Sequence, residues 1–130
     1  MPALNTYIVE DSPVIRENLI ATLEELVPIE VVGTAEDEAT ASGWLGQSGN
    51  LADLVIVDIF LKRGSGLGVL RSAMGGVGSP GDRKLVVLSN YATPDMRRKC
   101  LELGAERVFD KSADIDALIG YCNGLAEAAR

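Results

Sequence analysis

The feature that most constrains the fold of this chain is a short apolar run between two aspartates. Leu54-Val55-Ile56-Val57 are four consecutive apolar residues, flanked by Asp53 and Asp58. A strand that is apolar on both of its faces is typical of a parallel sheet covered by helices on both sides. We therefore expect a buried strand over residues 53–58 with Asp58 at its carboxyl end, where ligands gather in sheets of this kind.

The same alternation extends over the whole chain, because apolar, β-prone runs are followed by segments with helical periodicity. The predicted strands cover residues 7–9, 30–35, 53–58, 84–88 and 107–109. Five such strand–helix units in succession predict an α/β fold with a parallel sheet and helices on both of its faces. No linker of domain size appears within the 130 residues, so we expect one domain over residues 1–130.

Several predicted helices carry recognisable start signals. Ser12-Pro13 and Thr93-Pro94 each combine a hydroxyl that can cap free backbone N–H groups with a proline suited to the first helical position. Ser112 is expected to cap the last helix. The inward stripe of the first helix is predicted to consist of Ile15, Leu19, Leu23 and Leu26.

The charge of the chain bounds its partners. It has 12 basic and 19 acidic residues, which give a formal net charge of −7. Nucleic acid and anionic membranes require a positive protein surface, so we expect neither as a partner. No apolar run approaches the ~20 residues of a membrane span, and the N-terminus lacks the pattern of a signal peptide. We therefore expect a cytoplasmic protein.

Histidine is absent, and the two cysteines are widely separated. The first fact excludes catalysis by imidazole and zinc sites that need histidine ligands. Cys100 and Cys122 match no metal-binding spacing, and both fall on apolar faces of predicted helices. We expect them to be buried free thiols.

Polar residues stand at the ends of four of the predicted strands. They are Glu10, Asp11, Asp58, Ser89 and Lys111. Right-handed crossover connections bring the carboxyl ends of parallel strands to one edge of a sheet. We therefore expect these side chains to converge on one spot, although they are far apart in the sequence.

Such a cluster has a definite chemistry. Each close pair of carboxylates repels by about 1–4 kcal/mol at a surface-like dielectric, so three of them share protons or hold a cation. A few accessible oxygen ligands suit Mg²⁺, which attracts phosphoryl groups. Carboxylates also form aspartyl-phosphates, and Asp58 is the candidate nucleophile because it ends the most buried strand. Lys111 would supply a positive charge and Ser89 a hydroxyl donor.

The order of these motifs resembles a known family. Val9-Glu10-Asp11-Ser12, Val57-Asp58, Leu88-Ser89 and Asp110-Lys111 follow one another as in the receiver domain of two-component response regulators. The resemblance covers essentially the whole chain. It implies a flavodoxin-like doubly wound (βα)5 fold with a five-stranded parallel sheet in the order 2-1-3-4-5.

The resemblance also implies a role for each strand-end residue. Asp58 would accept a phosphoryl group from a histidine kinase or a histidine phosphotransfer protein, Ser89 would bind a phosphoryl oxygen, and Lys111 matches the lysine of the family. The Mg²⁺ ligands would be Glu10, Asp11, Asp58 and the backbone carbonyl of Phe60. The chain would then be a signalling domain that catalyses only its own phosphotransfer and dephosphorylation.

The family commonly signals through its fourth helix, fifth strand and fifth helix, so a downstream protein is expected to dock there. The predicted fourth helix carries the basic run Arg97-Arg98-Lys99, which is either part of that docking surface or a solvated helix face. We expect a stand-alone receiver that is a monomer or a weak homodimer.

Three positions depart from the family pattern. Val108 stands where an aromatic switch residue is usual, Ser112 stands where proline usually follows the lysine, and Asn90 stands where a smaller residue usually follows the hydroxyl position. Val108 and Ser112 leave open a receiver-like scaffold that works without phosphorylation.

Two enzyme or binder alternatives also fit parts of the pattern. A phosphatase of the haloacid-dehalogenase type uses a strand-end aspartate and Mg²⁺, but it needs a second acid where Phe60 stands. A flavin or nucleotide binder needs a phosphate-cradling loop after the first strand, where Glu10-Asp11 would repel phosphate. The glycines at 64, 66 and 68 have the wrong spacing for such a loop and follow the wrong strand.

Overall fold

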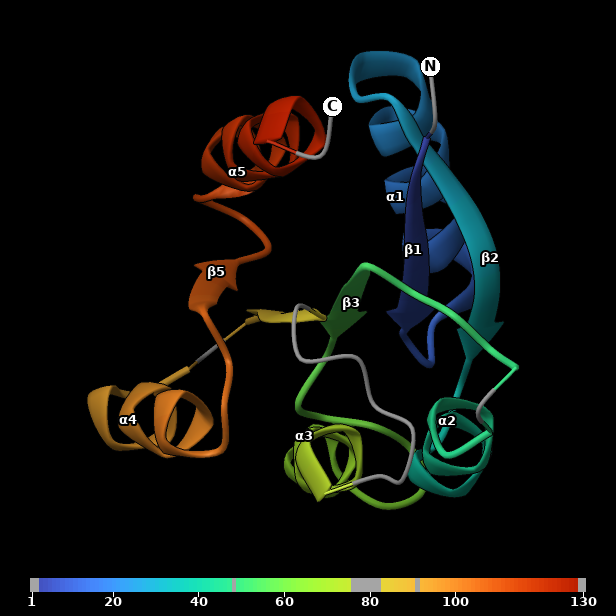
Figure 1. Ribbon diagram of the computed structural model, residues 1–130. Helices are drawn as coiled ribbons and strands as arrows, with labels where there is room; N and C mark the ends of the chain where they lie inside the picture. Colours follow the sequence, from blue (N-terminus) through green and yellow to red (C-terminus); the bar gives the residue numbers. More distant parts are fainter. Residues whose placement is uncertain (1–2, 48, 76–82, 91, 129–130) are drawn as a thin grey trace.

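A computed structural model describes residues 3–47, 49–75, 83–90 and 92–128 (Figure 1). Its centre is a parallel sheet of five strands in the order β2-β1-β3-β4-β5. The strands are β1 Leu4–Val9, β2 Ile29–Ala35, β3 Leu54–Val57, β4 Lys84–Ser89 and β5 Arg107–Asp110. The helices are α1 Pro13–Leu26, α2 Glu38–Leu45, α3 Gly66–Gly75, α4 Pro94–Glu102 and α5 Ile115–Ala128. The predicted flavodoxin-like (βα)5 fold and its sheet order are confirmed.

The sheet separates two layers of helices, and each layer covers its own half of the core. Helices α2, α3 and α4 lie along one face, whereas α1 and α5 lie along the other (Figure 1). Strand β3 serves both halves, because Val55 and Val57 pack with the first layer while Leu54 and Ile56 pack with the second. All four side chains are at most 2 % exposed. The apolar run between the two aspartates is therefore buried on both faces, as predicted.

The predicted start signals of two helices are confirmed. The Ser12 hydroxyl accepts a hydrogen bond from the backbone N–H of Ile15 at the start of α1. The Thr93 hydroxyl accepts one from the N–H of Met96 at the start of α4. Cys100 and Cys122 are buried free thiols in the two opposite halves of the core.

The predicted inward stripe of α1 is too long. Leu19 and Leu23 are buried, but Ile15 and Leu26 are 40 % and 52 % exposed. Leu26 is the last residue of α1, and the following Val27 fills the core in its place. Ile15 lies on the wall of an open groove between α1 and the start of α5.

The predicted cap of the last helix is wrong. Helix α5 begins at Ile115, three residues after Ser112. Ser112 instead donates two hydrogen bonds, from its backbone N–H and its hydroxyl, to Asp110 Oδ1 at 2.7 and 2.6 Å. The Asp110 side chain thus organises a turn of its own before the helix starts, which a serine before an apolar periodicity does not reveal.

Within the described residues, none of the helices has the length and apolar character that crossing a membrane would require.

Candidate functional site

The backbone ladder of the sheet brings the predicted site residues to one edge. Glu10 follows β1 and donates its backbone N–H to the carbonyl of Ala35, while Asp58 follows β3 and donates its own to the carbonyl of Val9. Ser89 is the last residue of β4 and Lys111 follows β5, and the N–H of Lys111 donates to the carbonyl of Ser89. Four strand ends therefore meet at one place, as the sequence predicts.

Asp58 lies at the centre of this group and is only 5 % exposed. Its Oδ1 accepts hydrogen bonds from the hydroxyl of Ser89 at 3.0 Å and from the backbone N–H of Phe60 at 3.2 Å. Its Oδ2 accepts one from Lys111 Nζ at 2.8 Å. Both oxygens of the carboxylate are thus held in place by three groups, which come from the end of β4, the loop after β3 and the residue after β5.

Lys111 connects two acids. Its ammonium lies 2.8 Å from Asp58 Oδ2 and 2.5 Å from Glu10 Oε1. Burial disfavours the charged ammonium, but hydrogen bonds to Asp58 and Glu10 outweigh that effect and raise the pKa of Lys111 above its usual value. Burial also raises the pKa of Glu10, against the opposing hydrogen bonds from Lys111 and the Ser12 N–H. The site is therefore an acid cluster that one lysine partly neutralises.

The carboxylates of Glu10, Asp11 and Asp58 are close enough to share a cation. Each offers one oxygen, and these oxygens all lie within 4.8 Å of one another. A set of oxygen donors alone, with Asp11 only half-buried, fits Mg²⁺, which usually keeps several of its waters. The donor set is thus compatible with the predicted ion, and Asp11 is the ligand on the accessible side.

Phe60 lies beside Asp58 on the loop toward α3. Its side chain is 52 % exposed, and its backbone forms an isolated bridge with Ser65. The role of its carbonyl as a metal ligand stays a prediction.

The departures from the family pattern are also placed. Val108 is half-buried in β5, and its carbonyl accepts a hydrogen bond from Arg97 of α4. Hydrogen bonds from Ser112 lower the pKa of Asp110, the residue before the lysine. Of the basic run on α4, Arg97 is therefore tied to β5, whereas Arg98 and Lys99 are exposed.

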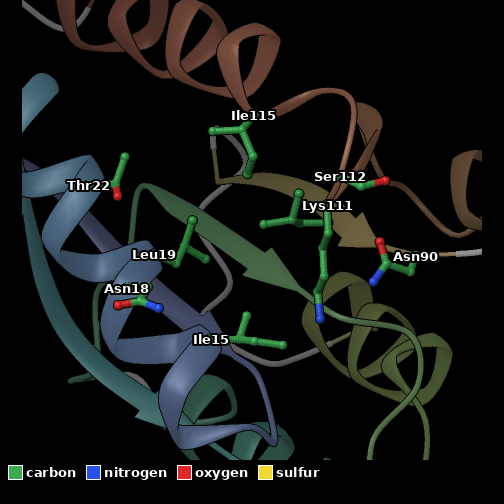
Figure 2. Close-up of a pocket in the computed structure, with 9 residues that line it drawn as sticks. Ile15, Asn18, Leu19, Thr22, Asn90, Lys111, Ser112 and Ile115 are labelled. Atoms are coloured by element: carbon green, nitrogen blue, oxygen red, sulfur yellow. The ribbon is translucent and has the colours of Figure 1, made fainter.

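A groove of about 350 Å³ opens next to Lys111 (Figure 2). Ile15 and Leu19 of α1 line one side of it, and Ile115 at the start of α5 lines the other. The amine end of Lys111 reaches away from the groove toward the acid cluster.

Sequence reasoning missed two residues that hold the site from outside. Arg16 donates to the backbone carbonyl of Glu10 at 2.8 Å and to Glu36 Oε1 at 3.1 Å, so it joins the loop of the acidic pair to the segment before α2. Glu38 accepts a hydrogen bond from the backbone N–H of Ser65 at 2.8 Å. Contacts between residues 20 and 27 positions apart leave no periodic signal in one sequence, so neither could be found there.

Comparison with known proteins places this geometry in a family. The model of the response regulator receiver domain matches residues 6–123. A protein-glutamate methylesterase/protein-glutamine glutaminase of Rhodopseudomonas palustris is 33 % identical over 111 residues, which are 83 % of this chain and 29 % of that protein. The chain therefore spans less than a third of the length of this relative.

Solved structures agree with the fold. The receiver domain of the putative response regulator NarL from Mycobacterium tuberculosis has a TM-score of 0.81 and 19 % identity, with 98 % of both chains covered. The phosphorylated cyanobacterial phytochrome response regulator RcpA has a TM-score of 0.71 and 25 % identity, with 97 % of this chain and 93 % of that one covered. With the family model matching nearly the whole length, the chain belongs to the response regulator receiver domains.

Proposed function

We propose that this receiver domain accepts a phosphoryl group on Asp58 and passes the signal on through changed contacts with other proteins. The observation that carries the proposal is the setting of the Asp58 carboxylate. Ser89 and Lys111 hold its two oxygens, and Glu10 and Asp11 lie close enough to share a cation with it. A carboxylate that merely ended a strand would need none of these companions.

The donor in this proposal is a phosphohistidine on a histidine kinase or a histidine phosphotransfer protein. One Asp58 oxygen forms a bond to phosphorus while the phosphorus–nitrogen bond breaks. The imidazole leaves with the electron pair of that bond and takes up a proton from solvent. None of the 130 residues is a histidine, so the donor residue lies outside this sequence.

The residues of the site would share the work of this transfer. Lys111 would balance the charge of the incoming phosphoryl group from its place between Asp58 and Glu10. Ser89 would donate its hydroxyl to a phosphoryl oxygen. Glu10, Asp11, Asp58 and the carbonyl of Phe60 would hold Mg²⁺, which when bound neutralises negative charge on the phosphoryl oxygens.

We further propose that the output surface is formed by α4, β5 and α5. The Arg97 bond to the carbonyl of Val108 joins α4 to β5, directly before the strand end that carries Lys111. The chain would act as a cytoplasmic receiver, a monomer or weak homodimer, with protein partners rather than nucleic acid. The formal charge of −7 supports the last point. The methylesterase activity named for the relative is not proposed, because the chain spans only 29 % of it.

Incubation with Mg²⁺ and acetyl phosphate tests the proposal. The intact mass of the wild type should rise by one phosphoryl group, and neither Asp58→Ala nor wild type with excess EDTA should show the rise. An unmodified wild type would instead favour a scaffold that works without phosphorylation. A steady release of phosphate from a generic aryl phosphate would favour the phosphatase alternative.

A further inference from the structure

The glycines at 64, 66 and 68 fit no nucleotide-binding pattern, yet the structure gives their loop a definite occupant. The carboxylate of Glu38, the first residue of α2, lies in this loop between β3 and α3. Its Oε1 accepts a hydrogen bond from the backbone N–H of Ser65 at 2.8 Å, and its own backbone N–H donates to the carbonyl of Arg63 at 3.1 Å. The glycine loop thus cradles an anion that belongs to the chain itself.

The Glu38 side chain fills the space that a side chain at Gly64 or Gly68 would need. A Cβ atom at Gly64 would lie 2.4 Å from the Cβ of Glu38, and one at Gly68 would lie 2.3 Å from its carboxyl carbon. Because α3 begins at Gly66, the carboxylate also lies at the positive end of that helix. A second side chain and the Glu38 carboxylate therefore cannot occupy this place together.

The cradle touches the segment that carries the phosphoacceptor. Ser65 forms a backbone bridge with Phe60, and the N–H of Gly66 donates to the carbonyl of Ile59 at 2.9 Å. The backbone N–H of Phe60 in turn donates to Asp58 Oδ1. Only Ser65 stands between the Glu38 carboxylate and the main chain of Phe60.

We propose that Glu38 is a positioning residue for the metal site. By holding Ser65 it fixes the main chain of Phe60 against Asp58, so that the Phe60 carbonyl and the Asp58 carboxylate would both be available to bind Mg²⁺. This inference rests on the proposed function, because it assumes that the acid cluster binds Mg²⁺. What it adds is that α2, which contributes no ligand, sets the affinity of the site.

Two variants of Glu38 and one control variant test the proposal, with Mg²⁺ affinity measured by calorimetry. Glu38→Ala loses the acceptor and should bind Mg²⁺ at least about 10-fold more weakly, the range known for residues that orient metal ligands. Glu38→Gln loses the charge but keeps the oxygen acceptor, so its Kd should stay close to that of the wild type. Glu30→Ala, an exposed acid at the opposite end of β2, is the matched control and should bind like the wild type.

A reciprocal variant tests the same contact from the loop. In the wild-type background Gly68→Ala must expel the Glu38 carboxylate, so it should weaken Mg²⁺ binding about as much as Glu38→Ala. In the Glu38→Ala background the same change should cost nothing further, because the two residues act as one unit. The Ser65 amide should exchange with deuterium faster in Glu38→Ala and Gly68→Ala, but not in Glu38→Gln.

The possible failures are distinguishable. If the wild type binds Mg²⁺ and is phosphorylated but Glu38→Ala has the same Kd, the positioning role is overturned and the proposed function stands. Equal losses in Glu38→Gln and Glu38→Ala would also overturn it, because charge and not the acceptor would then matter. A wild type that neither binds Mg²⁺ nor accepts a phosphoryl group would overturn the proposed function itself.

Discussion

Lys111 lies between two carboxylates, those of Asp58 and Glu10, and supplies the positive charge that both of them need. It lies within 2.8 Å of Asp58 and 2.5 Å of Glu10, and the three side chains are 13 %, 6 % and 4 % exposed. Breaking a buried pair by removing one partner leaves an uncompensated charge, which costs more than the pair itself contributes. At this residue, function and stability therefore depend on the same contacts.

We expect Lys111→Ala to lower the free energy of unfolding by about 2 kcal/mol without Mg²⁺, because Glu10 and Asp58 lose their shared cation. Saturating Mg²⁺ should recover more stability in the variant than in the wild type, since it restores positive charge to the acid cluster. Urea unfolding with and without Mg²⁺ measures both effects. Lys99→Ala, which removes an exposed lysine of α4, is the control. A variant as stable as the wild type in EDTA would contradict the expectation.

Tyr7 gives a second prediction, in alkaline solution. Its ring is fully buried and stacks on Trp44 with centroids 4.0 Å apart, and among the described residues its hydroxyl has no hydrogen-bond partner. Burial, with the nearby charge of Asp37, raises the pKa of Tyr7 to about 12. The unfolded chain ionises this tyrosine near pH 10 while the folded chain does not, so the stability it contributes falls between pH 10 and 12.

We therefore expect Tyr7→Phe to be more stable than the wild type by about 1 kcal/mol at pH 7, because no buried donor is left unsatisfied. The advantage should grow between pH 10 and 12, by up to about 3 kcal/mol. Denaturant unfolding followed by the fluorescence of Trp44, the one tryptophan of the sequence, measures it. A difference between the two proteins that does not change with pH would refute the assignment.

At the scale of single elements, the sequence predicted those features that depend on neighbouring residues, namely the burial of a strand and the caps of two helices. The run 54–57 is buried on both faces because all four of its side chains are apolar, and Ser12 and Thr93 cap helices because their hydroxyls reach only three residues ahead. The same reasoning failed at Ser112, where the Asp110 side chain competes for the serine.

The site was predictable in part for the same reason. The carboxyl ends of parallel strands lie at one edge of the sheet, so the proximity of Asp58, Ser89 and Lys111 could be predicted from the sequence alone. Arg16 and Glu38 could not, since their contacts depend on how the loops fold over the edge of the sheet.

Two glycine substitutions with opposite expected effects on stability test the close approach of α3 to the backbone of the site. A Cβ at Gly66, where α3 starts, would lie 2.2 Å from the carbonyl oxygen of Asp58, so Gly66→Ala must move the backbone of the site. We expect it to lose at least about 2 kcal/mol of stability and to slow phosphorylation by acetyl phosphate.

Gly124→Ala in α5 is the comparison. A Cβ at Gly124 would have no atom within 4 Å apart from the backbone of its own helix, so this variant should gain about 1 kcal/mol through helix propensity alone. Chemical unfolding and intact-mass kinetics measure the pair, and equal effects would contradict the close approach at Gly66.

At the scale of the whole molecule, the site lies next to the proposed output surface of α4, β5 and α5. Ser89 ends β4 and pairs in register with Asp110 of β5, and Lys111 follows directly. Arg97 of α4 holds the carbonyl of Val108 in the same strand. Helix α2 lies toward the β2 edge and packs on α3 (Figure 1), and its contact with the site runs through the Ser65 N–H that Glu38 accepts. A change at Asp58 is therefore connected to α4 and β5 through Ser89 and Lys111.

This arrangement predicts which part of the backbone should change when Asp58 is phosphorylated. The phosphoryl group of an acyl phosphate carries a charge of about −1.5 to −2, which replaces the single charge of the carboxylate. This larger charge should draw Ser89 and Lys111 and disturb the register partners that they adjoin. With acetyl phosphate and Mg²⁺, we expect backbone amides of residues 94–110 to change their deuterium exchange. Asp58→Ala under the same conditions is the control and should show no change.

The route of this response can be tested as well. Val108 stands where the family usually has an aromatic switch residue, so we expect the response to travel through the backbone pairing of β4 with β5 and the Arg97 bond. Arg97→Ala should therefore reduce the response in α4 but leave the extent of phosphorylation unchanged, and an undiminished response in α4 would exclude this route.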